Sequence, residues 1–221
     1  GVRQRLSPAY AFGGKRPLVS SDWFPTFNRD NVELVTGPIA RIESDAVVMA
    51  DGTRRQADVL ILATGFQTTR FLSVIPVTGR DGRTLDEAWR DGARAYLGMT
   101  TSGFPNLFML YGPNTNNGSI LHNIECQANY VVRHLRWMER ENVAAIDIRP
   151  DVLAAYNDEI QRKIAAIPAW NADVAGYYRA DNGLNVTQWP DGMQHYREVT
   201  SVLDPAVYEV IRVTATAEAA G

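Results

Sequence analysis

The 221-residue sequence contains no glycine-rich loop of the G-x-G-x-x-G or G-x-x-x-x-G-K-[S/T] type, the usual backbone cradle for nucleotide phosphates. Its single cysteine, Cys126, excludes an internal disulfide, so nothing indicates an oxidising compartment. No apolar run approaches the roughly 20 residues needed to span a bilayer. The N-terminus has neither a secretory apolar core nor an initiating Met. We therefore expect a cytoplasmic location, no transmembrane segment and a beginning that has been cut off.

Clusters of basic residues and of metal ligands are also missing. The 22 Lys and Arg residues against 25 Asp and Glu residues give a net charge of −3, which argues against a nucleic-acid surface. His122, His134 and His195 lack metal-ligand spacing, so no metal site is predicted. Cys126 has no basic partner nearby in the sequence, and we expect it to serve packing rather than nucleophilic chemistry.

Two continuous apolar runs set the expected fold class. Val59–Leu62 and Leu107–Tyr111 each end in a glycine-containing turn, and both predict strands buried on two faces, as in a parallel sheet. Shorter strands are expected at 32–35, 41–42, 47–49 and 143–148. Asp51-Gly52 predicts a hairpin with a type I′ turn. Strands, loops and helices in this order predict an α/β fold, in which some neighbours of the buried strands are absent.

The second half of the chain predicts helices. One begins near Ser119, and a second begins at Pro150, where proline suits the first turn. The expected apolar face of the first helix consists of Ile120, Ile124, Val131, Leu135 and Met138. The expected stripe of the second consists of Leu153, Tyr156, Ile160, Ile164 and Ile167. A short helical turn is expected after Ser21-Asp22, and residues 169–200 are expected to be ordered but irregular.

Several longer stretches then follow one another in a specific order. They are FGGKRPLVSSDWFPTFNRDNVELV, DGTRRQADVLILATGF, YLGMTTSGFPNLFMLYGPNTN, the helix with Ile124-Glu125-Cys126-Gln127, and NGLNVTQWP. Together they resemble the Baeyer–Villiger monooxygenases, a class of FAD- and NADPH-dependent flavoproteins, and within them a branch described as acting on aryl ketones such as 4-hydroxyacetophenone. The resemblance implies a two-dinucleotide-binding, Rossmann-like architecture that is incomplete here, because the N-terminal FAD-binding portion is missing. Residues 1–65 would close the NADP-binding domain and residues 66–221 the FAD-binding domain.

The resemblance also implies roles for individual residues. Arg16 matches the family's catalytic arginine, and a guanidinium suits negative charge on oxygen because it stays protonated and presents several fixed donors. Lys15 matches a position near the 2′-phosphate of NADPH. Two short segments match cofactor-binding positions: Ala63, Thr64 and Gly65, and Gly112, Pro113 and Asn114. Thr115, Asn117, Ile120 and Tyr177 match positions that line the substrate pocket, the last of them loosely.

Three activities remain open from the sequence. The first is oxygen insertion into a ketone to give an ester, with O₂ and a small ketone as substrates. The second is a related flavin monooxygenase that oxidises amines or sulfides, which Arg16 disfavours. The third is a non-catalytic chain, or a subunit that needs a separate FAD-binding partner. Without a glycine-rich loop, the isolated chain is expected to be inactive.

Overall fold

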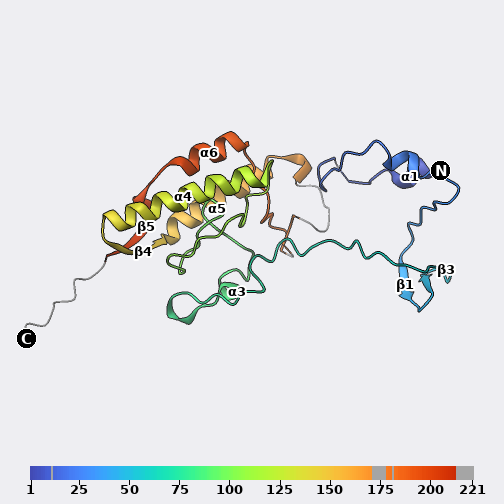
Figure 1. Cartoon of the computed structure of the whole chain (residues 1–221), viewed down its shortest axis with the longest axis horizontal. Coiled ribbons are helices and arrows are strands. Elements are labelled where there is room, and N and C mark those ends of the chain that lie inside the picture. The colour runs from blue at the N-terminus through green and yellow to red at the C-terminus, as the bar shows by residue number, and fades with distance from the viewer. Residues whose placement is uncertain (11, 171–177, 181, 213–221) are drawn as a thin grey trace, which may run out of the picture. The chain divides into compact units, whose positions relative to one another are not determined.

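The computed structural model describes residues 1–10, 12–170, 178–180 and 182–212, and divides the chain into two compact units (Figure 1). The first unit is Gly1–Phe66 and the second is Gln67–Gly221. This division lies one residue from the boundary expected from the sequence. Which cofactor domain each unit completes stays a prediction. No helix among the described residues is long and apolar enough to cross a membrane.

The first unit is built around a small antiparallel sheet in the order β1–β2–β3. Its strands are β1 (Ile39–Ile42), β2 (Ala46–Met49) and β3 (Arg54–Gln56), and it also contains the short helices α1 (Val2–Leu6) and α2 (Trp23–Thr26). Side chains of β2 are largely buried, whereas those of β1 are exposed. The strands expected at 41–42 and 47–49 are confirmed, but residues 32–35 form no strand.

The β2–β3 turn differs from the expected type I′ turn. Gly52 has a φ of +83°, but Asp51 is not in the left-handed region, and the Met49 carbonyl accepts from the Gly52 N–H at 3.0 Å. The Met49 N–H donates in turn to the Thr53 carbonyl at 2.9 Å. A three-residue connection with one left-handed glycine accounts for this pattern, in which only the glycine needs a positive φ.

The second unit consists of helices beside an antiparallel strand pair. α4 (Ile120–Arg140), α5 (Pro150–Ala165) and α6 (Met193–Ser201) accompany β4 (Val143–Ile148) and β5 (Tyr208–Arg212) (Figure 1). α4 packs on both α6 and β4. The helix after Pro150 and the strand at 143–148 are confirmed. α6, β5 and the short α3 (Leu85–Ala88) were not expected, although Thr84 and Glu87 form a complete capping box at the start of α3.

Both predictions of a buried strand are wrong, because neither apolar run forms a strand in this structure. Val59, Leu60, Ile61 and Leu62 are exposed coil, and Leu107–Tyr111 forms no strand, with Leu110 exposed. A strand is stable only when another strand accepts its backbone hydrogen bonds. Among the described residues, no strand pairs with either run, so neither apolar sequence forms a strand.

The buried face of α4 also differs from the expected one. Ile120 and Leu135 are exposed, and of the five expected apolar positions only Met138 is buried. The residues that α4 buries are Asn123, Cys126, Gln127, Tyr130, His134, Trp137 and Met138. Polar and aromatic side chains therefore dock this helix, and an aliphatic face remains exposed.

His134 lies at the centre of the packed aromatic face. Its ring stacks on Tyr130 with centroids 3.9 Å apart and meets Tyr208 edge-on at 5.5 Å. Its Nδ1 donates to the Tyr130 carbonyl at 2.9 Å, while the buried Nε2 has no hydrogen-bond partner. Burial lowers the pKa of His134, because an added proton on Nε2 would meet no acceptor.

This environment predicts acid sensitivity of the second unit. The unfolded state takes up a proton near pH 6.5, before the folded state does, so the stability conferred by neutral His134 is complete above that pH and is lost as the pH falls below it. The free energy of unfolding, measured with urea at pH 7.5 and at pH 5, should therefore be lower at pH 5. His134→Phe should reduce this pH dependence, by no more than about 1.4 kcal/mol per pH unit for one proton. An equal pH dependence in the variant would contradict the role of His134.

Candidate functional site

The first unit presents two adjacent cations. Lys15 and Arg16 are both exposed, and the Lys15 Nζ lies 5.3 Å from the centroid of the Tyr10 ring. Arg16 forms no ion pair or hydrogen bond with the residues that the structure describes. A guanidinium without a carboxylate partner retains its full capacity to bind an anionic group.

Ala63, Thr64 and Gly65 follow the exposed apolar run. All three are exposed, and Gly65 has a φ of +84°. A Cβ at Gly65 would meet no atom within 4 Å. The glycine is therefore required here by the backbone conformation and not by crowding. Contact of this segment with a cofactor stays a prediction.

In the second unit, the loop from Gly112 to Asn117 crosses another backbone segment at very short range. A Cβ at Gly112 would lie 2.4 Å from the Gly98 carbonyl oxygen, and a Cβ at Gly98 would lie 2.0 Å from Cγ2 of Thr115. Gly112, Pro113, Asn114 and Thr115 are buried. Glycine at both positions permits this approach, which places the loop over the turn at 97–98.

The polar side chains at the start of this loop bind the protein itself. Both amide hydrogens of Asn114 are used, because Nδ2 donates to the Asn185 carbonyl at 2.9 Å and to the Gln188 carbonyl at 3.0 Å. The Thr115 hydroxyl donates to the Gly112 carbonyl at 2.7 Å. These side chains therefore fix the loop, and any contact that they make with a ligand must come from their remaining acceptors or from the backbone.

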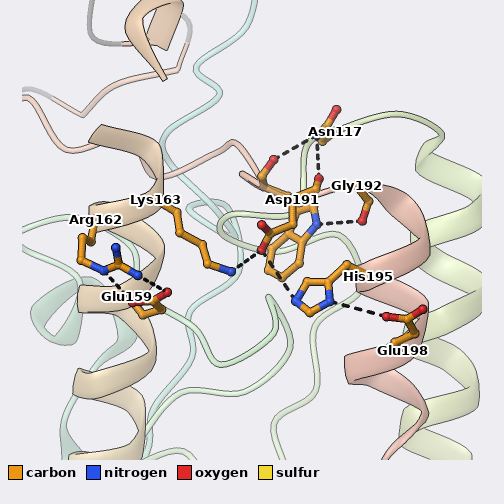
Figure 2. Close-up of polar contacts among 9 residues, drawn as sticks. Asn117, Glu159, Arg162, Lys163, Asp191, Gly192, His195 and Glu198 are labelled. Carbon is orange, nitrogen blue, oxygen red and sulfur yellow. Dashed lines mark hydrogen bonds and ion pairs between the residues drawn. The ribbon is translucent and has the colours of Figure 1, made fainter. Parts of the chain in front are cut away.

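Asn117 has the same kind of role at the end of the loop. Its Nδ2 donates to the Trp189 carbonyl at 3.1 Å and to the Asp191 carbonyl at 2.9 Å. Figure 2 shows Asn117 beside Asp191. The Asp191 carboxylate in turn accepts from Lys163 Nζ at 2.7 Å and lies 3.8 Å from His195 Nε2. The loop, the segment at 185–192 and the ends of α5 and α6 are thus tied together.

The first turn of α4 is the part of this region that remains open. Ser119 Oγ accepts the His122 N–H at 3.4 Å, whereas the N–H groups of Ile120 and Leu121 have no acceptor within the helix. Ile120 is 47% exposed and Leu121 is 74% exposed. Tyr177, the remaining predicted pocket residue, lies outside the described residues.

Sequence reasoning missed the buried amides of α4. Asn123 Nδ2 donates to the Thr115 carbonyl at 2.7 Å, and Gln127 Oε1 accepts the Tyr111 N–H at 2.7 Å. Asn123 and Gln127 are spaced by four residues and His134 follows at seven more, so all three share one helical face. That spacing of polar residues in a long helix was the available signal.

The prediction that Cys126 lacks a basic partner is wrong, because α4 places a histidine next to its thiol. His122 Nε2 lies 3.6 Å from Cys126 Sγ, one turn earlier on α4. The same nitrogen lies 3.3 Å from the Met193 carbonyl, which can only accept, so Nε2 carries a proton. It cannot then accept the thiol proton, and a packing role for Cys126 agrees with this geometry.

The described residues fit only part of a flavin nucleotide. In the second unit, the N–H groups of Ile120 and Leu121, which have no acceptor within α4, suit the polar edge of a ring system. In the first unit, Lys15 and Arg16 suit anionic groups. The sequence supplies no phosphate-binding glycine loop. Within the described ranges, no group of three or more His, Cys, Asp or Glu residues could hold a metal ion.

Comparison with known proteins shows which enzymes the chain is similar to. The chain is 38% identical over 202 residues to an FAD-binding monooxygenase of Aspergillus niger, covering 89% of the chain and 33% of that protein. It is 36% identical over 218 residues to a Baeyer–Villiger monooxygenase of Streptomyces coelicolor, covering 96% of the chain and 41% of the relative. These relatives are flavin-dependent monooxygenases, which confirms the predicted class of enzyme. No protein-family model matches the chain.

Solved structures agree at the level of the fold and the family. A steroid monooxygenase bound to NADP matches with a TM-score of 0.84 at 28% identity, over 96% of this chain and 41% of its own. Cyclohexanone monooxygenase from Rhodococcus sp. Phi1, bound to NADP⁺, gives 0.84 at 27% identity, over 95% of this chain and 41% of its own. The α/β prediction is confirmed, and the comparisons support the Baeyer–Villiger monooxygenase family. The chain spans one third to about two fifths of the length of these relatives.

The crossing of Gly98 and Gly112 generates a stability prediction with a matched control. Gly98 has a φ of +67°, and the Cβ added by Gly98→Ala would overlap Thr115. Gly103 has a φ of +88°, and the Cβ added by Gly103→Ala would meet no atom within 4 Å. Both variants bear the strain of a left-handed alanine, but only the first is also overpacked. Gly98→Ala should lose at least about 2 kcal/mol more than Gly103→Ala in urea unfolding. Equal losses would show that the crossing is not tightly packed.

Proposed function

We propose that this chain is a portion of an FAD- and NADPH-dependent monooxygenase that inserts one oxygen atom of O₂ into a ketone to give an ester, the other atom leaving as water. The observation that carries the proposal is Arg16, whose exposed guanidinium has no partner among the described residues and lies in the motif that resembles the Baeyer–Villiger enzymes. Similarity to proteins of that name over 96% of the chain supports it.

The chain's own cations would supply the electrostatics. When bound, FAD and NADPH supply the redox chemistry. Arg16 would stabilise negative charge on oxygen as the carbon–oxygen bond forms, because a fixed cation favours the charged state over the neutral ketone. Lys15, one residue earlier, would bind the 2′-phosphate of NADPH as a point charge. Residues 1–65 would then complete the NADP-binding domain, and residues 66–221 the FAD-binding domain.

The second unit would contribute the floor of the flavin and substrate site. Gly112-Pro113-Asn114 would approach the cofactor mainly through the backbone, since the Asn114 amide hydrogens are engaged. Ala63-Thr64-Gly65, which belong to the first unit, would also bind the cofactor. Among the predicted pocket residues that the structure describes, Ile120 has an exposed side chain, whereas Thr115 and Asn117 donate hydrogen bonds to the protein. Ile120 would therefore contact substrate directly, and the other two would hold the loop.

Two other activities are distinguished by specific observations. An amine or sulfide oxidase would not depend on Arg16, because no carbonyl oxygen acquires charge during that reaction. A chain that works as a subunit would require a separate polypeptide carrying the two glycine-rich loops, which a neighbouring reading frame would reveal. The ketone itself, including 4-hydroxyacetophenone, is a matter for substrate profiling of the full-length protein.

The role of Arg16 can be tested in a full-length protein that contains this chain. In Arg16→Ala, NADPH should still reduce the flavin, while ester formation falls at least about a hundredfold, the typical loss for one such electrostatic stabiliser. Arg16→Lys keeps the charge but not the planar fork, so it should retain more activity than the alanine variant. Flavin bleaching and product analysis measure the two steps separately. Ester formation at the parent rate in Arg16→Ala would remove Arg16 from catalysis.

Coenzyme choice tests Lys15 independently. NADPH and NADH differ in the 2′-phosphate, so Lys15→Ala should raise the KM for NADPH about tenfold or more and leave the KM for NADH nearly unchanged, the loss expected for one charge-assisted contact. Steady-state kinetics with both coenzymes provide the measurement, and the exposed Arg29→Ala serves as a charge-matched control. Parallel changes for both coenzymes would exclude this role.

A further inference from the structure

Tyr111 has a backbone conformation that its side chain does not favour. Its φ is +59°, in the left-handed region, and it directly precedes Gly112. A bulky residue in this region is unfavourable in isolation and persists only where surrounding contacts hold it. Such conformations concentrate at sites where a loop must adopt one particular orientation, so the contacts that hold Tyr111 bear on the loop that follows.

One of those contacts comes from a buried side chain. Gln127 of α4 is 0% exposed, and its Oε1 accepts the Tyr111 N–H at 2.7 Å. Its Nε2 donates to Tyr196 Oη at 2.8 Å and to the Leu97 carbonyl at 3.4 Å. Tyr196 Oη donates to the same Leu97 carbonyl at 2.8 Å. One amide therefore joins α4, α6 and the turns at 97 and 111.

Both of these turns are left-handed, and they meet at the glycine crossing. Leu97 has a φ of +51°, and the carbonyl of the adjacent Gly98 is the group that a Cβ on Gly112 would strike. Tyr111 also contacts the loop that follows it, since its hydroxyl donates to Asn116 Oδ1 at 2.9 Å. The orientation of residue 111 therefore determines where the loop from 112 to 117 begins, and it supports that loop near its end.

We propose that Gln127 is a positioning residue, which holds Tyr111 in its left-handed conformation and thereby sets the orientation of the Gly112–Asn117 loop toward the bound cofactor. Gln127 is fully buried, and its side-chain amide bonds to Tyr111, Tyr196 and Leu97 of the protein itself. The first half of the inference concerns the chain alone. The second half rests on the proposed function, because it requires that the loop borders the flavin.

Amide hydrogen exchange tests the first half in the full-length protein. Gln127→Met preserves length and helix propensity but removes all the hydrogen bonds of the amide. Exchange in peptides covering 109–117 should rise at least about tenfold, because the Tyr111 N–H loses its acceptor. Peptides covering β4 should be unaffected and serve as the internal reference. Asn157→Met is the matched control, since Asn157 is also buried but donates within α5, to the Leu153 carbonyl at 2.8 Å.

Kinetics and the flavin spectrum test the second half. Gln127→Met should bind one FAD per chain, show a shifted visible flavin band and lose about tenfold in kcat, because the loop no longer approaches in one orientation. Asn157→Met should retain the parent spectrum and kcat. If the loop exchanges faster but spectrum and kcat stay at parent values, Gln127 holds the loop without serving the reaction, and the second half is overturned.

The remaining outcomes are also decisive. Parent exchange rates at 109–117 in Gln127→Met overturn the inference. If that variant loses protection everywhere, Tyr196→Phe replaces it, because it removes one anchor of the Gln127 amide and should raise exchange at 109–117 about threefold, with no rise contradicting the proposal. If the parent full-length protein oxidises no ketone, the proposed function fails, while the exchange measurement still decides the positioning role.

Discussion

The second unit depends on two backbones crossing where neither can carry a side chain. Gly98 and Gly112 meet so closely that a Cβ on either would overlap the other segment. The residue that precedes each of these glycines, Leu97 or Tyr111, has a left-handed backbone conformation. Those turns direct backbone polar groups inward, and buried side chains must satisfy them. The amide face of α4 is a consequence of this requirement.

Local signals predicted the elements whose formation needs little tertiary support. The proline and apolar stripe of 150–165 determine a helix, and the aliphatic run at 143–148 determines a strand, which β5 completes. The runs at 59–62 and 107–111 have equally strong patterns, but a pattern supplies no partner for the backbone. The capping box at Thr84 was present in the sequence and marks α3. α6 begins with no side-chain cap, which explains why sequence reasoning missed it.

The candidate site, like the fold, was predicted from the sequence only in part. Resemblance to a family pointed to Arg16 and to the Gly112–Asn114 segment, since those residues lie in motifs that can be aligned. It did not point to the hydrogen bonds by which Asn114 and Asn117 bind the segment at 185–191. Partners separated by about seventy positions cannot be inferred from one sequence, because any exposed carbonyl would satisfy an amide equally well. The burial of Gln127 and Asn123 depends on the same long-range contacts.

The exposed stretch at the end of the first unit has a practical consequence for handling this chain. Residues 58–66 are exposed, and within the described chain they contribute one backbone hydrogen bond, from Ala63 N–H to the Ile61 carbonyl at 3.2 Å. A protease needs an extended, accessible backbone, and here it would have almost nothing to unfold first. Its aliphatic side chains suit enzymes that cleave beside Leu or Phe, so a brief digest should cut the chain first within this stretch.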